Sequence, residues 1–293
     1  MASLFTGVHP ETHGVADGLV QQGEILGQEV LAEEFEVVAE ILGQAGYRTF
    51  AVAASAHLGH RFGFSQGFDR FENVGFSNAG KALAALEAMA VEIDLGAGPY
   101  FVWLHLFDPH DPYTPRRPWI RDYFPQPGEL RQSAFSSPRE LRKDLAARQQ
   151  AGDEPRNEVV EFARAVYDSE INFTDRAVYR AFDILGVSSA DLVVVTSDHG
   201  EEFLEHRDFG HAGSLYEEQV RIPLIVRLPH QADAGRVIEE PVSLLDILPS
   251  ILDWLDLEPP ASIQGRSFLS RLEDGEFPER SIYLSLSRPD TQL

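Results

Sequence analysis

Short apolar runs alternate along the chain with longer segments of helical periodicity. Four runs rich in β-branched or aromatic residues predict strands, and these cover Thr49–Ala54, Tyr100–Leu106, Asp191–Thr196 and Pro223–Val226. Four segments with apolar residues three and four positions apart predict helices, and these cover Val30–Ala45, Ala79–Ile93, Glu158–Leu185 and Ser243–Leu255. Alternation of this kind is typical of a parallel sheet covered by helices. The pattern therefore predicts an α/β fold with a mostly parallel sheet between helical layers.

The lengths of the apolar and polar runs limit the class of protein to which the chain can belong. Its longest apolar run, Tyr100–Phe107, has the length of a strand and is far shorter than the roughly 20 residues of a membrane span. The polar segment 126–157 carries scattered prolines, and we interpret it as a surface insertion that is partly helical. With 43% hydrophobic residues in 293, the chain can bury a sizeable core.

Charge and cysteine content narrow the function classes. The formal net charge of −23 argues against nucleic acid as a partner. It would also repel an anionic substrate at long range, so a site that processes anions needs local positive charge. The chain has no cysteine, which excludes disulfides and thiolate chemistry within these residues.

The strongest chemical signal follows the run Val193–Thr196. The next residues include Asp198, His199 and Gly200, so a buried strand is predicted to end at a carboxylate, an imidazole and a tight turn. Ligands bind at this edge in open α/β sheets, and Asp and His are good ligands for a divalent metal ion. A strand followed by a merely acidic turn is the competing interpretation.

Other histidines are predicted to reach the same edge. His57 follows Thr49–Ala54, Asp108 and His110 follow Tyr100–Leu106, and His211 lies in a glycine-flanked loop. If the sheet is parallel, these strand ends meet, and a metal ion surrounded by imidazoles could polarise an anionic ester. Asp108 could equally cap the proline turn that follows it. Five other histidines are better explained as surface or structural residues: His9, His60, His105, His206 and His230.

Eight segments, in order, resemble the sulfatase branch of the alkaline-phosphatase superfamily. They are Ala2–Gly7 with Pro10–Gly14, Leu42–Thr49, Gly63–Asp69 (G-F-x-x-G-F-D), Phe107–Tyr113 (F-D-P-H-x-P-Y), Thr196–Glu201 (T-S-D-H-G-E), Tyr216–Leu224, Asp246–Ser250 and Gln264–Ser267. The resemblance implies the fold of that superfamily, in one catalytic domain over residues 1–293. It also implies a hydrolase in which an activated hydroxyl attacks a sulfate or phosphate ester beside a divalent cation.

Carried over by motif, Asp198 and His199 are expected metal ligands, and His57, His110 and His211 are expected catalytic residues that contact the ester or protonate the leaving group. The resemblance implies Ca²⁺ first, with Mn²⁺ or Zn²⁺ as alternatives because an imidazole occupies position 199. One carboxylate and one imidazole are few ligands, so we expect weak binding. Lysines common at two family positions are replaced here by Ser55 and His211.

The start of the chain departs from the family pattern. Met1 aligns with the Arg of the family's C/S-x-P-x-R nucleophile segment, so we expect the nucleophile, the first strand and its metal carboxylates to be missing and the C-terminus to be short. Ser3 lies on the wrong side of the expected position. The predicted function is metal-dependent hydrolysis of small-molecule or glycan sulfate esters, with these 293 residues inactive alone. The alternatives are phosphoester or phosphonate hydrolysis, phosphoryl-group transfer, and a non-catalytic metal-binding relative.

Overall fold

The structure is a computed structural model, and it describes residues 1–15, 19–22, 24–94, 96–124, 138–151, 153, 157–269 and 280–286. The chain divides into two compact units. The first contains Met1–Ser77, Ala84–His105 and Asp233–Leu293, and the second contains Asn78–Leu83 and Leu106–Ala232. Among the described residues, no helix is both long and apolar enough to cross a membrane. The single-domain expectation stays a prediction.

A parallel three-stranded sheet organises the first unit. Strand β3 (Arg48–Ala53) lies in the middle and pairs with β4 (Arg70–Asn73) on one side and β5 (Tyr100–His105) on the other. Both pairings are parallel, as the alternation of strands and helices predicts. A separate antiparallel hairpin is formed by β1 (Leu19–Gln22) and β2 (Glu24–Gln28).

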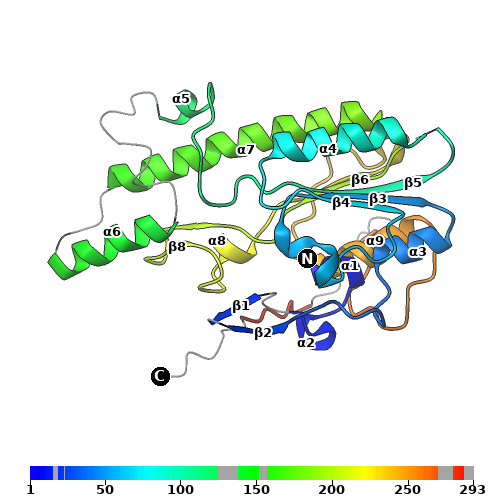
Figure 1. The fold of residues 1–293 in the computed structure, drawn as a ribbon, viewed down its shortest axis with the longest axis horizontal. Coiled ribbons are helices and arrows are strands. Elements are labelled where there is room, and N and C mark those ends of the chain that lie inside the picture. Colours follow the sequence, from blue (N-terminus) through cyan, green and yellow to red (C-terminus); the bar gives the residue numbers. More distant parts are fainter. Residues whose placement is uncertain are drawn as a thin grey trace. The chain divides into compact units, whose positions relative to one another are not determined.

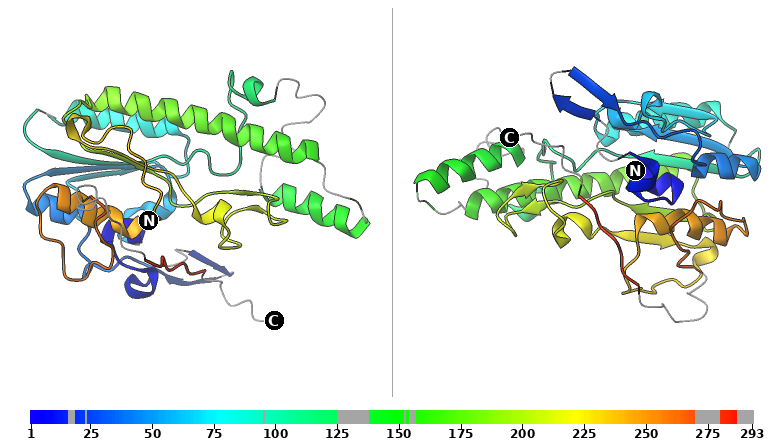
Figure 2. Two further views of the ribbon diagram at one scale, coloured as in Figure 1. Left: turned by 180° about the vertical axis from the view of Figure 1, so that it is seen from behind. Right: turned by 90° about the horizontal axis from the view of Figure 1, so that it is seen from below.

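Helices cover this sheet. One face of the sheet is covered by α1 (Ala2–Thr6), α3 (Val38–Gln44) and α9 (Ile247–Trp254). The other face is covered by the later turns of α4 (Ala79–Glu92) (Figures 1 and 2). The core of the unit is aromatic: Phe5 packs edge-on against Trp103 with ring centroids 4.7 Å apart. The first unit also contains α2 (Pro10–His13) and the short helices η1 (Ala56–Leu58), η2 (His60–Phe62) and η4 (Leu244–Asp246).

The second unit is built on the long helix α7 (Asn157–Leu185). α7 packs against α5 (Ile120–Tyr123) and against β7 (Glu202–Phe203), and β7 pairs with β8 (Phe209–Gly210). α6 (Pro138–Ala151) packs near β8, within the predicted insertion; residues 125–137 of that region lie outside the described residues. The unit also holds β6 (Val193–Thr196), α8 (Glu217–Val220), β9 (Leu224–Arg227) and η3 (Pro229–Gln231).

Two predicted elements differ in the structure. The helix predicted over Val30–Ala45 begins only at Val38, because the Leu31 N–H donates to the Phe62 carbonyl (3.1 Å) and the Leu31 carbonyl accepts from Gln66 Nε2 (2.8 Å). The strand predicted at Pro223–Val226 exists at Leu224–Arg227, but it pairs antiparallel to β6. A parallel pairing needs a long crossover, and in the connecting residues the structure describes only short elements.

A buried ion network fixes the loop after β5. The Arg116 guanidinium contacts the Asp108 carboxylate and lies 3.2 Å from Glu170 of α7, with its carbon Cζ 4.2 Å from the Phe173 ring centroid. Asp108 also accepts the Ala79 N–H at the start of α4 (2.6 Å). The Arg116 N–H donates to Ser169 Oγ (3.0 Å). The single guanidinium of Arg116 therefore pairs with two buried carboxyl groups, those of Asp108 and Glu170.

Glu170 should make folding stability depend on pH. Burial raises the pKa of Glu170 from 4.5 to about 8, although the nearby Arg116 lowers it in part. Between these values the folded protein holds a proton that the unfolded chain has lost, so this group makes stability fall as pH rises from about 5 to 8. We expect Glu170→Gln to flatten that decline by a few kcal/mol, at about 1.4 kcal/mol per pKa unit. Urea unfolding across this pH range is the measurement. The exposed Glu161→Gln is the control, and an unchanged slope in Glu170→Gln would contradict the assignment.

Candidate functional site

Three histidines of the second unit form the candidate site, and His110 is the first. It lies in the loop that follows β5, where its ring stacks on Phe107 with centroids 4.4 Å apart. Its Nδ1 lies 2.8 Å from the Asp111 carbonyl oxygen and 3.2 Å from the Asp111 carboxylate. Because these oxygens only accept, Nδ1 carries the hydrogen and Nε2 of the neutral ring keeps its lone pair.

His199 follows β6, as the motif predicts. Its Nδ1 donates to the Gly200 carbonyl (2.8 Å), and its Nε2 lies 3.8 Å from Asp198 Oδ1. The turn requires glycine: a Cβ at Gly200 would lie 2.1 Å from the Glu218 carbonyl oxygen, and the Gly200 N–H donates to the Gln219 carbonyl (2.8 Å). The backbone after the strand is therefore held in one path.

His211 follows β8 and is paired with a carboxylate. Its Nδ1 lies 3.0 Å from Glu201 Oε1, and the Glu201 side chain is only 3% exposed. Desolvation lowers the pKa of His211, but the hydrogen bond and charge of Glu201, with the charges of Asp111 and Asp198, outweigh it and raise the pKa overall. His211 is thus the imidazole of the cluster that these neighbours favour as a cation.

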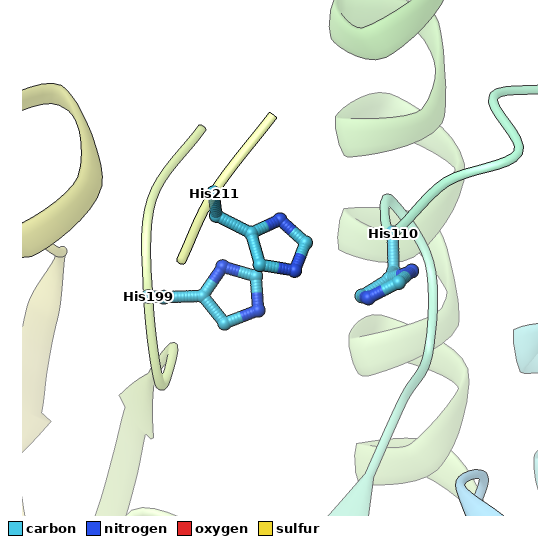
Figure 3. Close-up of side chains that lie close together, drawn as sticks. All are labelled: His110, His199 and His211. Carbon is cyan, nitrogen blue, oxygen red and sulfur yellow. The ribbon is translucent and has the colours of Figure 1, made fainter. Parts of the chain in front are cut away.

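The three imidazoles face one another (Figure 3). The rings of His199 and His211 are stacked, with centroids 3.9 Å apart, and the ring of His110 stands edge-on to His211 at 4.9 Å. One ring nitrogen from each histidine lies within 4.8 Å of those of the other two. We call His110, His199 and His211 the imidazole cluster. Its arrangement could hold a metal ion or surround an anionic group.

A buried carboxylate anchors the loop that carries two members of this cluster. Glu202 of β7 accepts the backbone N–H groups of His206 and Asp208, each at 3.0 Å, and the side-chain amide of Gln219 at 3.0 Å. Glu202 is 1% exposed, so these bonds satisfy a charge that would otherwise be costly to bury. Glu202 is a positioning residue for the loop.

His57 belongs to the first unit. It lies in η1 directly after β3, where its backbone N–H donates to Ser55 Oγ (3.3 Å) and its ring packs against Phe76 with centroids 5.1 Å apart. The predicted position beyond a strand end is therefore observed. A role for His57 beside the imidazole cluster stays a prediction.

Asp108 has a structural function here. Its carboxylate caps α4 through the Ala79 N–H and pairs with Arg116, so both oxygens are engaged within the protein. Of the two interpretations of Asp108 from the sequence, the capping one describes its contacts better, although the capped element is a helix and not the proline turn.

Ser3 forms a pair with His13 that does not activate it. His13 Nδ1 accepts the Val15 N–H (3.1 Å), so Nε2 carries the hydrogen and donates to Ser3 Oγ (2.9 Å). Burial lowers the pKa of His13 to about 4, which keeps the ring neutral. A ring in this tautomer cannot take the hydroxyl proton through Nε2, and Ser3 is not an activated nucleophile here.

Sequence reasoning missed the partners of the cluster. Asp111 and Glu201 were parts of quoted motifs and Glu202 follows the second of them, but nothing in the sequence separates the carboxylate that orients His211 from the adjacent one that anchors the loop. The alternation of side-chain direction along extended chain was the available signal. Two histidines expected to be structural contact aromatic rings: His60 stands edge-on to Phe71, and His206 stacks on Tyr216.

Comparison with known proteins decides the family. A family model described as Sulfatase matches residues 1–257. The chain belongs to the sulfatase family. This confirms the resemblance of the eight sequence segments.

Individual relatives agree with this assignment. The sulfatase is 27% identical over 177 residues to the uncharacterized sulfatase YidJ of Escherichia coli (strain K12), a match covering 59% of this chain and 35% of that relative. It is 34% identical over 109 residues to steryl-sulfatase of Mus musculus, covering 32% of this chain and 18% of the relative. The chain spans at most 35% of the length of the first curated relatives it matches.

Solved structures share the fold of this sulfatase. The phosphonate monoester hydrolase of Agrobacterium radiobacter superposes with a TM-score of 0.68 at 20% identity, covering 94% of this chain and 68% of that one. A 2-O GAG sulfatase superposes with a TM-score of 0.66 at 18% identity, covering 96% and 64%. These matches confirm the predicted α/β fold with its parallel sheet and helices.

Proposed function

We propose that this sulfatase family member is a metal-dependent sulfuric ester hydrolase. The observation that carries the proposal is the imidazole cluster, in which each ring has Nδ1 engaged by an oxygen acceptor and the rings face one another. Protonation of an imidazole in this cluster supplies a hydrogen-bond donor and local positive charge within a strongly acidic protein. A site for a sulfate ester needs that local charge.

We assign Asp198 and His199 to a divalent cation. The carboxylate and the imidazole Nε2 are 3.8 Å apart, which allows both to reach one ion. When bound, the ion supplies Lewis-acid polarisation of the ester. Ca²⁺ remains the first expectation from the family, and Mn²⁺ or Zn²⁺ are the alternatives that an imidazole ligand favours.

His211 binds the charged end of the ester. The neighbouring carboxylates that raise its pKa increase the fraction of imidazolium near neutral pH, although desolvation opposes them. An imidazolium Nε2–H donates to a non-bridging sulfate oxygen, and Glu201 balances the charge from the other side of the ring.

His110 and His57 donate the proton that the leaving group needs. As a hydroxyl nucleophile bonds to sulfur and the bond between sulfur and the alcohol oxygen breaks, that alcohol oxygen takes a proton from an imidazolium and departs as the alcohol. His110 is placed for this role by its stacking on Phe107 and its bond to Asp111. The part of His57 rests on the sequence motif. The substrates proposed are small-molecule or glycan sulfate esters.

The test is hydrolysis by the full-length gene product. We expect His211→Gln to lower kcat/KM for 4-nitrophenyl sulfate by about 100-fold or more, because it removes a charged donor from the site. His206→Gln, which changes a histidine of the same loop outside the cluster, is the matched control. Activity of His211→Gln equal to that of the control would overturn the role of His211.

The leaving group separates the roles within the cluster. His110→Gln should slow hydrolysis of phenyl sulfate more than that of 4-nitrophenyl sulfate, because the poorer leaving group depends more on a proton. The imidazole at position 199 favours phosphoester or phosphonate hydrolysis as the second candidate function. A preference for 4-nitrophenyl phosphate or phosphonate esters would support it, and cation binding without any turnover would support a non-catalytic relative.

A further inference from the structure

The imidazole cluster is a candidate transition-metal site whose ligand set differs from the Asp198–His199 pair. Its three candidate ligand atoms come from His110, His199 and His211, and they lie within 4.8 Å of one another. All three belong to the second unit, so the cluster is complete within one compact body. In Figure 3 the rings of His199 and His211 lie together on one side, and the ring of His110 lies opposite them.

The outer contacts prepare each ring as a ligand. Each Nδ1 lies 2.8–3.0 Å from an oxygen acceptor: the carbonyls of Asp111 and Gly200, and the carboxylate of Glu201. These bonds place the hydrogen on Nδ1 and leave Nε2 to face the centre. Metal-binding histidines usually donate their other N–H to a carbonyl or carboxylate in this way, which fixes the ring and strengthens it as a ligand.

The charge around the cluster favours a cation. Within reach of the three rings lie the carboxylates of Asp111, Asp198 and Glu201, at 3.2, 3.8 and 3.0 Å from ring nitrogens. The rings are 21–35% exposed, so an ion can enter from solvent. The surroundings therefore offset the charge of a bound divalent ion without filling its ligand positions.

We propose that Nε2 of His110, His199 and His211 together bind one Zn²⁺ ion. Zinc prefers nitrogen and sulfur ligands in four-coordinate geometry, and three protein ligands leave one position open. Zn–N bonds of about 2.0–2.1 Å correspond to a ligand separation of about 3.4 Å, so the rings need to approach by about 1.4 Å or less from the observed limit. Ca²⁺ prefers six to eight oxygen ligands and fits this set poorly.

This site goes beyond the proposed function. A ring whose Nε2 binds zinc can neither hold an ester oxygen nor deliver a proton, so zinc and ester are alternative occupants of His110 and His211. We expect excess Zn²⁺ to inhibit whatever ester hydrolysis the protein performs. Zn²⁺ binding requires neither the ester nor turnover. The zinc site would therefore still stand if the protein hydrolysed no sulfate ester.

Metal binding to the full-length protein, freed of any polyhistidine tag, tests the proposal. Calorimetry should give one Zn²⁺ per chain, bound at least 100-fold more tightly than Ca²⁺. Co²⁺, which substitutes for zinc, should produce the intense visible absorption of a four-coordinate site. His110→Ala and His211→Ala should each weaken Zn²⁺ binding about 100-fold or more. Glu201→Gln, which changes only an outer contact, should weaken it about 10-fold.

Two further variants separate the possible sites. His60→Gln, in the first unit, is the control and should bind Zn²⁺ as the wild type does. Asp198→Ala should retain Zn²⁺ if the three imidazoles hold it. Binding lost in Asp198→Ala but kept in His110→Ala and His211→Ala would place the ion on Asp198 and His199 alone and overturn the proposal. Absence of the Co²⁺ absorption in a protein with a wild-type melting temperature would overturn it as well.

Discussion

We expect Arg116→Met to lower the free energy of unfolding by about 3–5 kcal/mol at pH 8, the cost of leaving buried charge uncompensated. Methionine keeps an unbranched side chain against the Phe173 ring, so the loss comes mainly from the guanidinium. Without it, the carboxylates of Asp108 and Glu170, which are 5% and 2% exposed, face each other across the vacated position. The loop that carries His110 would lose its anchor on α7.

The pH dependence of this loss should follow the ionisation of Glu170. Burial already raises the pKa of Glu170 to about 8 with Arg116 present, so removal of the guanidinium leaves a carboxyl that is neutral over a wider range. Below about pH 8 Glu170 holds its proton in both proteins, so the destabilisation measured by urea unfolding should change little between about pH 5 and 7 and should grow as pH rises above about 8. The control is Arg221→Met, because Arg221 and Glu217 are 82% and 84% exposed and their pair is worth at most about 0.5 kcal/mol. Equal effects of the two substitutions would contradict this account.

Gly200→Ala should be the second severe substitution. The added Cβ would lie 2.1 Å from the backbone oxygen of Glu218, and no side-chain movement can relieve a clash with backbone. We expect a loss of about 3 kcal/mol, from overpacking together with a weakened Gly200–Gln219 hydrogen bond. Because the Gly200 carbonyl orients His199, Zn²⁺ binding should weaken at least about 10-fold.

Gly43 offers the matched control for Gly200. It lies within α3, and a Cβ there would meet nothing within 4 Å. Gly43→Ala should therefore raise stability by about 0.5–1 kcal/mol, the usual gain for alanine in a helix. Urea midpoints and calorimetric zinc titrations of both variants are the measurements. A Gly200→Ala protein within 0.5 kcal/mol of wild type would show that the turn can move.

The strands were the part of the fold most accessible from sequence. β5 and β6 lie within the predicted ranges, and β3 is shifted from its range by one residue, because their runs of β-branched and aromatic residues are bounded by turn residues. The start of α3 could not be found in the same way. Leu31 and Val37 are as buried as helical residues, but their burial comes from packing in a loop whose backbone bonds reach residues about 30 positions away. Periodicity does not record such long-range bonds.

The site was predictable only in part. The motifs singled out His110, His199 and His211 as chemistry-bearing positions, and the structure brings them together within one unit, while their chemical roles stay predictions. Which ring nitrogen faces the centre depends on backbone carbonyls and on Glu201, and no spacing rule predicts those contacts. Asp108 shows the reverse case: its place beside His110 pointed to chemistry, while its partners Ala79 and Arg116 make it structural.

Glu201 and Glu202 are neighbours in the chain, but their side chains make different contacts. One orients the His211 ring, and the next anchors the loop through His206, Asp208 and Gln219. Successive side chains of an extended backbone point in opposite directions. Gaining or losing one residue between Gly200 and Phe203 would therefore exchange the directions of the two glutamate side chains, and with them their contacts. The chain can thus lose the imidazole cluster by a change of length alone, with every histidine retained. Among relatives, the spacing of this turn is a marker of the cluster that is independent of the histidines themselves.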